Sequence, residues 1–269
     1  RAIMRIEDIL GVRLFTRSTR RVALTAAGRE FVPVAERLLA DLEIGIQNMQ
    51  ALGSRQRGRL VIASLMSVAY GVLPQVIAQY RDRYHGVEME LREGVLSSVT
   101  EDVRSGVADF GIGDSTNASA IPASIAVEPL TESGFHVVLR RGHPLARKSA
   151  LQMADLQDAW MIAMPTGAGM RQSIDAAAMA ADVAFDRTIT VSQFATIFRL
   201  VQAGVGISIV PDLALAQTAY KGIVSRELQE PRLNLRLGLL RLKDRPVSPA
   251  SEGFMELLRA RFAAPDRTA

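Results

Sequence analysis

The segment between residues 10 and 29 has the composition of a phosphate-binding surface. It contains no acidic residue before Arg29 and carries basic side chains at Arg13, Arg17, Arg20 and Arg21. Guanidinium groups bind phosphate oxygens through charge-assisted hydrogen bonds, and a cluster of them attracts polyanions. Short apolar runs at 12–15 and 22–24 flank the basic residues, a pattern that predicts a two-stranded ribbon with a cationic tip. The sequence therefore predicts contact with a nucleic-acid backbone.

The excess positive charge of the chain is confined to its N-terminal fifth. Residues 1–59 hold 11 Arg, no Lys and 6 acidic residues, whereas residues 60–269 hold 21 basic and 22 acidic residues. The balance is therefore +5 in the first segment and −1 in the second, within a net charge of +4. This asymmetry is typical of a polyanion-binding head on a neutral body, although a solvated helix surface would give a similar count.

A second group of positions has residue types suited to a small ligand. Small hydroxyls and backbone N–H groups at the start of a helix suit a carboxylate or another anion, although each Ser or Thr could also be an N-cap. These positions lie close to the ends of predicted strands. They are Ser64, Ser67, Gly94, Ser97, Thr166, Gly167, Gly169, Ser192 and Phe194.

The sequence lacks the residue patterns of common catalytic centres. It has no cysteine, which excludes disulfides, thiolate metal sites and cysteine nucleophiles. The three histidines, His85, His136 and His143, have no metal-ligand spacing, and neither a Gly-x-Ser-x-Gly elbow nor a P-loop is present. We expect no enzyme activity, no cofactor and no metal. With no apolar run of membrane-spanning length, the expected location is the cytoplasm, without membrane contact.

A long helix is expected to follow the basic ribbon. Thr25 stands where an N-cap belongs, and the predicted helix runs to about residue 52, which is roughly 40 Å long. Its apolar residues recur at steps of four and three. They are Phe31, Ala35, Leu38, Leu42, Gly45, Met49 and Leu52. This heptad pattern favours a coiled coil, and so a dimer or tetramer, over a helix that packs on the body of its own chain.

Strands and helices alternate from residue 59 onward. In the first series, predicted strands at 60–63, 87–91 and 108–112 enclose helices at 68–84 and 97–105. This βαβαβ order implies a parallel sheet. A second series of strands and helices is predicted between residues 135 and 210, and a strand at 235–240 and a final helix at 248–262 would return to the first lobe. In paired α/β lobes the ligand cleft lies between them, at the carboxyl ends of the strands.

These segments together resemble the LysR-type transcriptional regulators. The matching motifs include Leu10-Gly-Val-Arg-Leu-Phe-Thr-Arg, Leu24-Thr-Ala-Ala-Gly-Arg, Arg104-Ser-Gly-Val-Ala-Asp and Val201-Gln-Ala-Gly-Val-Gly-Ile-Ser-Ile-Val-Pro. The resemblance covers nearly the whole chain and implies an α/β protein. Its parts would be a partial winged helix-turn-helix head at 1–24, a dimerising linker helix and hinge at 25–58, and a two-lobed effector domain of the periplasmic-binding-protein type. Lobe I is expected at 59–133 and 242–269, and lobe II at 134–241.

The resemblance also implies roles for the candidate residues. The effector would be a small organic molecule, an anion being one class that fits, bound at the cleft positions named above. DNA would be bound by the head. The expected DNA-contacting residues are Arg1, Arg5, Arg17, Ser18, Thr19, Arg20 and Arg21. Because the head of this family has further helices before its recognition helix, we expect the chain to start inside that domain. The alternative is a stand-alone solute-binding protein, which would share the two lobes but would not need the basic head or the heptad helix.

Overall fold

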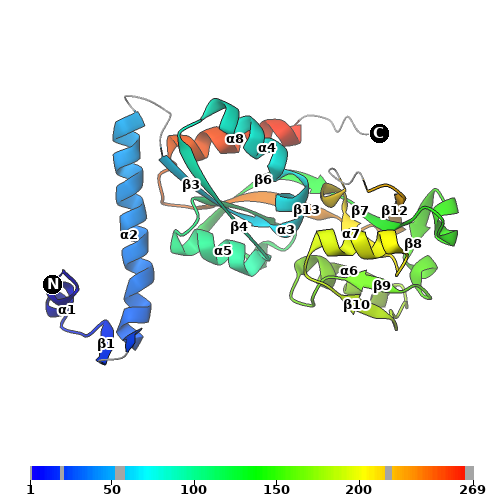
Figure 1. The fold of residues 1–269 in the computed structure, drawn as a ribbon, viewed down its shortest axis with the longest axis horizontal. Helices are drawn as coiled ribbons and strands as arrows, with labels where there is room; N and C mark the ends of the chain where they lie inside the picture. Colours follow the sequence, from blue (N-terminus) through cyan, green and yellow to red (C-terminus); the bar gives the residue numbers. More distant parts are fainter. Residues whose placement is uncertain (1, 19–20, 52–57, 216–219, 264–269) are drawn as a thin grey trace.

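The protein consists of a small head, a long helix and a body of two lobes (Figure 1). The computed structural model describes residues 2–18, 21–51, 58–215 and 220–263. In the head, helix α1 (Ala2–Leu10) ends at Gly11, whose φ of +67° is the left-handed conformation that glycine adopts readily. Strands β1 (Phe15–Ser18) and β2 (Arg21–Leu24) then form an antiparallel pair, so the predicted ribbon is confirmed.

The long helix α2 (Ala26–Ala51) begins at the predicted N-cap. The Thr25 hydroxyl oxygen accepts a hydrogen bond from the Gly28 amide at 3.0 Å and the hydroxyl donates to the Arg13 carbonyl at 2.6 Å. The first bond satisfies one of the amides that a helix start leaves without a partner. The second bond connects the start of α2 to the loop before β1. Thr25 therefore fixes the direction in which α2 leaves the head.

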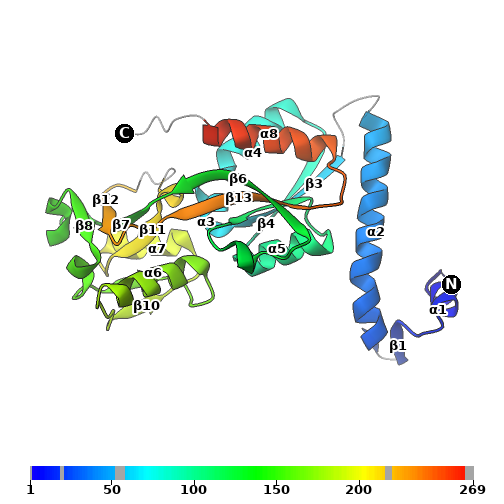
Figure 2. The same ribbon diagram turned by 180° about the vertical axis from the view of Figure 1, so that it is seen from behind.

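Lobe I is built on a five-stranded sheet of order β4-β3-β5-β13-β6. Its strands are β3 (Gly58–Leu65), β4 (Val87–Gly94), β5 (Phe110–Asp114), β6 (Ile125–Ser133) and β13 (Leu235–Leu242). As predicted, β3 runs parallel to both β4 and β5, whereas β13 is antiparallel to β5 and β6. Helices α4 (Leu73–Arg83) and α8 (Pro249–Ala263) cover one face of the sheet, and α5 (Leu96–Ser105) covers the other (Figures 1 and 2).

Lobe II contains a four-stranded sheet of order β11-β7-β12-β8. Its strands are β7 (Phe135–Arg140), β8 (Ala150–Gln152), β11 (Ser208–Pro211) and β12 (Ile223–Glu230). The parallel pair β9 (Met161–Ala163) and β10 (Thr188–Thr190) joins this lobe through a bridge between Met161 and Ile207. The helices of the lobe are α6 (Gly169–Ala180) and α7 (Phe194–Ala203). Short 3-10 turns lie at Ala118–Ala120, Pro144–Arg147, Met153–Leu156 and Asp212–Ala214.

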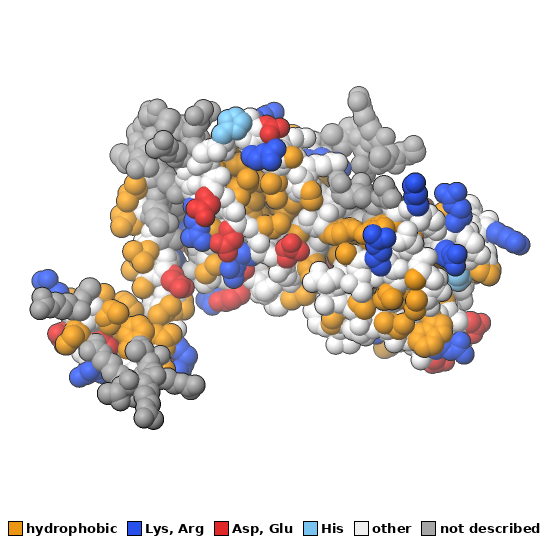
Figure 3. All heavy atoms as spheres, in the orientation of Figure 1, with side chains coloured by type: hydrophobic (Ala, Val, Ile, Leu, Met, Phe, Trp, Pro, Cys, Tyr) orange, Lys and Arg blue, Asp and Glu red, His pale blue; other side chains and the backbone are white. Residues whose placement is uncertain are grey.

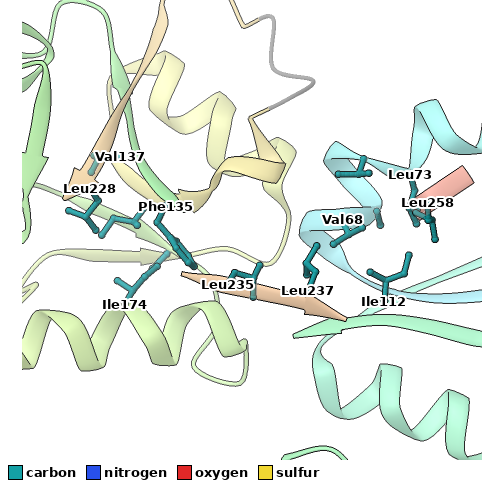
Figure 4. Close-up of a cluster of buried hydrophobic side chains, with 14 of the residues drawn as sticks. Val68, Leu73, Ile112, Phe135, Val137, Ile174, Leu228, Leu235, Leu237 and Leu258 are labelled. Carbon is teal, nitrogen blue, oxygen red and sulfur yellow. The ribbon is translucent and has the colours of Figure 1, made fainter. Parts of the chain in front are cut away.

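The chain passes between the lobes twice, at neighbouring positions. Gly134 alone separates β6 in lobe I from β7 in lobe II, and a short turn after β12 leads back to β13. Because Leu235 pairs with Ser133, the two passages lie side by side. One apolar cluster continues through this region, with Phe135 and Leu235 between the cores of the two lobes (Figure 4). The lobes are therefore connected both by backbone and by a shared core.

The structure differs from the sequence prediction in two places within the body. The helix expected at 68–84 is two helices, α3 (Met66–Gly71) and α4, which meet at Val72. Pro74 lies in the first turn of α4, and a proline there cannot donate the amide hydrogen bond that a continuous helix would need. In addition, the strand predicted at 235–240 is β13 and lies in the sheet of lobe I, as expected for it, so the boundary between the lobes falls before Leu235 and not at the predicted residue 242.

Candidate functional site

A cleft lies where the carboxyl ends of strands from both lobes meet. It encloses about 540 Å³ of empty space, a volume that includes the part open to solvent. Lobe I contributes residues after β3, β4 and β5, and lobe II contributes residues at the starts of α6 and α7. The lining residues are Leu65, Met66, Ser67, Gly94, Val95, Leu96, Asp114, Met164, Ala168, Gly169, Met170, Phe194, Pro211 and Leu235.

Two polar side chains, Ser67 and Asp114, stand in this otherwise apolar lining. The Oδ1 atom of Asp114 accepts a hydrogen bond from the Thr116 amide at 2.8 Å. Its Oδ2 atom lies 4.0 Å from the position that a Cβ on Gly169 would occupy, so the carboxylate reaches across to the first residue of α6. No Lys, Arg or His belongs to the described lining. The cleft can therefore offer a ligand one negative charge, one hydroxyl and apolar walls.

Four of the predicted ligand-binding residues line this cleft. Ser67 is buried at the second position of α3, and Gly94 ends β4. Gly169 and Phe194 are the first residues of α6 and α7. These four positions lie up to 127 residues apart in the sequence. The rule that ligands bind beyond the carboxyl ends of strands predicted that they share one site.

The other five predicted ligand-binding residues lie outside the lining. Ser64 is fully buried, and its hydroxyl donates to the Leu65 carbonyl at 3.2 Å. Ser97, Thr166, Gly167 and Ser192 are exposed. Each of the four follows the end of a strand in sequence, but its side chain or backbone is not part of the cleft wall. Direct ligand contact by these five residues stays a prediction.

Sequence reasoning missed the residue that gives the cleft its charge. Asp114 is the last residue of β5, whereas the sequence prediction ended that strand at residue 112. Extending the strand-end rule to this third strand would have found it. The methionines Met66, Met164 and Met170 were also missed, because an isolated methionine in a sequence does not distinguish a cleft wall from a core.

An aromatic cluster beside the cleft connects the two lobes. Tyr70 of lobe I stacks on Phe194 and Phe198 of α7, each at 5.8 Å between ring centroids. Its hydroxyl lies 3.2 Å from that of Tyr220 in lobe II. Burial, followed by the hydrogen bond to Tyr220, raises the pKa of Tyr70. Because Phe194 also lines the cleft, the cluster contacts both the site and the interface between the lobes.

The predicted heptad of α2 is exposed in the single chain. The side chains of Leu38 and Leu42 are both 60% exposed, and Figure 3 shows hydrophobic side chains along this helix. Phe31 and Ala35 are half-buried, and nothing lies within 4 Å of where a Cβ on Gly45 would be. The side chain of Met49 and the whole of Leu52 lie outside the described residues.

An ion pair between a buried arginine and a partly exposed aspartate connects α2 to lobe I. Asp41 lies 3.0 Å from Arg245, whose side chain is only 6% exposed. Arg245 also donates to the carbonyls of Gly106 and Ala108, at 3.2 and 3.3 Å. The guanidinium therefore joins α2 to the end of α5, and a movement of lobe I has a direct contact through which to act on α2.

The predicted DNA-contacting residues are described only in part. Arg5 is exposed on α1. Arg17 and Ser18 lie in β1 and Arg21 in β2, but their side chains are outside the described set. Arg1, Thr19 and Arg20 also lie outside the described residues. The ribbon geometry nonetheless places residues 17, 18 and 21 at the closed end of the hairpin, where Ser18 pairs with Arg21.

Neither a metal centre nor a membrane span is found within the described ranges. No group of three His, Cys, Asp or Glu side chains there could hold a metal ion. No described helix is both long enough and apolar enough to cross a bilayer.

Comparison with known proteins gives matches over nearly the entire chain. Residues 53–263 match the family described as "LysR substrate binding domain", and residues 1–29 match "Bacterial regulatory helix-turn-helix protein, lysR family". The uncharacterized HTH-type transcriptional regulator YbhD of Escherichia coli is 31% identical over 96% of this chain and 80% of its own length.

Solved structures share the fold as well. A full-length OxyR variant from Pseudomonas aeruginosa is similar with a TM-score of 0.74 and 21% identity, covering 98% of this chain and 84% of the other. The effector-binding domain of QuiR, solved in complex with shikimate, has a TM-score of 0.64 and 20% identity over 77% of this chain and 98% of the other.

Proposed function

The chain belongs to the LysR family of transcription regulators, and we propose that a small organic molecule bound between its lobes controls how a dimer of the chain binds DNA. It is a DNA-binding regulator with an effector-binding domain and not an enzyme. The observation that supports effector control most directly is the cleft, which takes its walls from both lobes. A ligand that contacts both walls favours one relative position of the lobes, in proportion to its preference for that position.

The exposed residues of α2 support the dimer. A helix with apolar side chains at heptad spacing and more than half exposed gains stability when a second helix covers them. A second copy of α2 has the matching pattern, so a twofold dimer is the smallest assembly that buries the apolar heptad residues of both helices, which form the seam of α2. A tetramer would need a further interface outside α2.

The basic ribbon supports a role in holding the DNA backbone. Arginines at a hairpin tip reach phosphates or a minor groove, and such contacts position a protein without reading sequence. We assign this role to Arg17, Arg20 and Arg21, with Arg5 on α1 as a further phosphate contact. The regulator would act in the cytoplasm, where bacterial DNA is found. A stand-alone solute-binding protein is the less favoured reading, because it leaves both the head and the seam of α2 without a use.

The regulator hypothesis is tested with DNA selected from a random library by the full chain. Adding a small-molecule extract of bacterial cells should change the affinity for that DNA at least tenfold. A Gly169→Phe variant places a ring in the cleft and should bind the DNA without responding to the extract. Met179→Phe, on the same helix and 80% exposed, is the matched control and should respond normally. An unchanged response in Gly169→Phe would overturn effector binding in this cleft.

A further inference from the structure

We infer that the cleft takes a small organic amine, an apolar body that carries one positive charge, and not the organic anion that the sequence suggested. The inference rests on the proposed function, since it names the ligand class of the same cleft. Its basis is the combination of one carboxylate, one hydroxyl and apolar walls in the cleft between the lobes.

The charge of the lining disfavours an anion. Asp114 is the one charged side chain among the fourteen described lining residues. A ligand carboxylate would enter a space with low-dielectric walls that already holds a like charge, and no cation there would offset the repulsion. A protonated amine would instead gain an opposite charge at hydrogen-bond distance.

The carboxylate of Asp114 retains the capacity to bind such a group. Oδ1 accepts the Thr116 amide, while Oδ2 accepts no hydrogen bond from the described part of the chain. The start of α6 would by itself favour an anion, but Oδ2 of Asp114 already lies beside its first residue, Gly169. The protein therefore supplies the negative charge at this position, and the ligand does not need to.

Nearby cations are occupied elsewhere. Arg171 of α6 forms an ion pair with Asp175 at 2.7 Å and donates to the Met164 carbonyl at 3.2 Å. Arg171 is not part of the lining, and its charge is offset by that of Asp175. Arg171 therefore does not change the net negative charge of the cleft lining.

The remaining walls fit an apolar body. Met66, Met164 and Met170 are unbranched and polarisable, so they adapt to the shape of a ring or a short alkyl chain. Phe194 adds an aromatic wall, and Ser67 adds a hydroxyl. The polar end of such a ligand would contact Asp114 and Ser67, and its apolar end would pack against the methionines.

Three probes of one shape separate charge from size. Benzylamine, benzyl alcohol and benzoate would be titrated into the full chain by calorimetry at pH 7. We expect benzylamine to bind at least tenfold more tightly than benzoate, with benzyl alcohol between them. Benzoate binding as tightly as benzylamine, or no binding of benzylamine, would overturn the inference.

Two matched variants assign the preference to one residue. Asp114→Asn keeps an Oδ1 acceptor for the Thr116 amide and removes the charge, so benzylamine should lose at least tenfold in affinity while benzyl alcohol changes less than twofold. Glu132→Gln removes an exposed acid on β6 and should change neither. An Asp114→Asn variant that binds benzylamine normally would contradict the inference. The proposed function fails by a separate result, namely an extract response that Gly169→Phe does not abolish.

Discussion

The head and α2 expose many large apolar side chains to solvent, whereas the two-lobed body buries most of its own. Eleven of the fifteen large hydrophobic side chains exposed in the described structure lie before residue 52, although this segment is less than a fifth of the chain. Ile9 is 77% exposed and Leu39 is 62% exposed. The body exposes only four such side chains and buries continuous clusters in both lobes. The body therefore buries most of its apolar surface within one chain, whereas the head and α2 leave much of theirs open to solvent.

The largest expected effect is the loss of a core side chain of the body. Phe254 is fully buried and packs against Tyr80 and Phe110, with ring centroids 5.2 and 5.9 Å away. Phe254→Ala should lower the free energy of unfolding by about 3–5 kcal/mol, measured by urea denaturation. Ile9→Ala, which truncates an exposed side chain of the head, should change it by less than about 0.5 kcal/mol. Similar losses in both variants would remove the contrast between the two regions.

A charge in the seam of α2 is expected to have the next largest effect. Leu42→Asp would place two carboxylates opposite each other in a dimer and should weaken self-association at least a hundredfold, about 2.7 kcal/mol. Sedimentation equilibrium of the full chain measures this change. Met179→Asp makes the same exchange on the exposed surface of the body and should leave the association constant unchanged. A Leu42→Asp protein that remains a dimer would show that the body alone holds the copies together.

The N-cap of α2 tests whether the head is stabilised locally. Thr25→Ala removes the acceptor for the Gly28 amide and should cost about 1 kcal/mol at the start of α2. Hydrogen exchange should become faster for amides 27–31 and stay unchanged in β3 and β5. Thr25→Ser keeps the hydroxyl and should retain most of the protection. Faster exchange throughout the body would mean that the two regions unfold as one unit.

The smallest expected effect is a pH dependence within the body. Hydrogen bonds from Arg259 of α8 hold the pKa of Glu128 in β6 below its ordinary value of 4.5. Because the folded pKa is lower, this pair stabilises the folded protein above about pH 4.5 and its contribution is lost as the pH falls through the folded value. Both side chains are about one third exposed, so the contribution should be about 0.2–1 kcal/mol.

Glu128→Gln isolates that contribution. The difference in free energy of unfolding between the original chain and the variant should shrink between pH 7 and pH 3. A difference between the original chain and Glu128→Gln that is constant with pH would exclude the ion pair as its origin.

Local sequence patterns predicted helices and their ends well where a single residue type determines where the helix starts or stops. Thr25 marked the start of α2, and the predicted helix at 97–105 matches α5 to within one residue. The strand-end rule also placed Ser67, Gly94, Gly169 and Phe194 in one cleft. In these cases the signal lies in a few consecutive residues, such as an N-cap hydroxyl or the glycine that ends a helix.

Features that depend on distant neighbours were not predicted. Strands β6 and β12 were missed, because each is an exposed or half-buried strand whose neighbours come from far along the chain. The sign of the charge in the cleft was missed for the same reason. The negative charge comes from Asp114, which lies opposite Gly169, 55 residues later in the sequence. A local sequence pattern cannot predict a contact between residues so far apart.

The two neighbouring passages between the lobes determine what kind of motion a ligand can drive. Sliding one sheet past the other would have to stretch two short connections that lie side by side, Gly134 and residues 231–234, whereas rotation about these passages needs only a few changed dihedrals. Under the proposed function, ligand binding would therefore rotate one lobe relative to the other. Because Arg245 contacts α2 at Asp41, the stretch of α2 from Asp41 to Ala26 would act as a lever arm of about 22 Å. For a lever of that length, a rotation of about 10° would displace the end beside the head by about 4 Å, roughly one base-pair step of DNA.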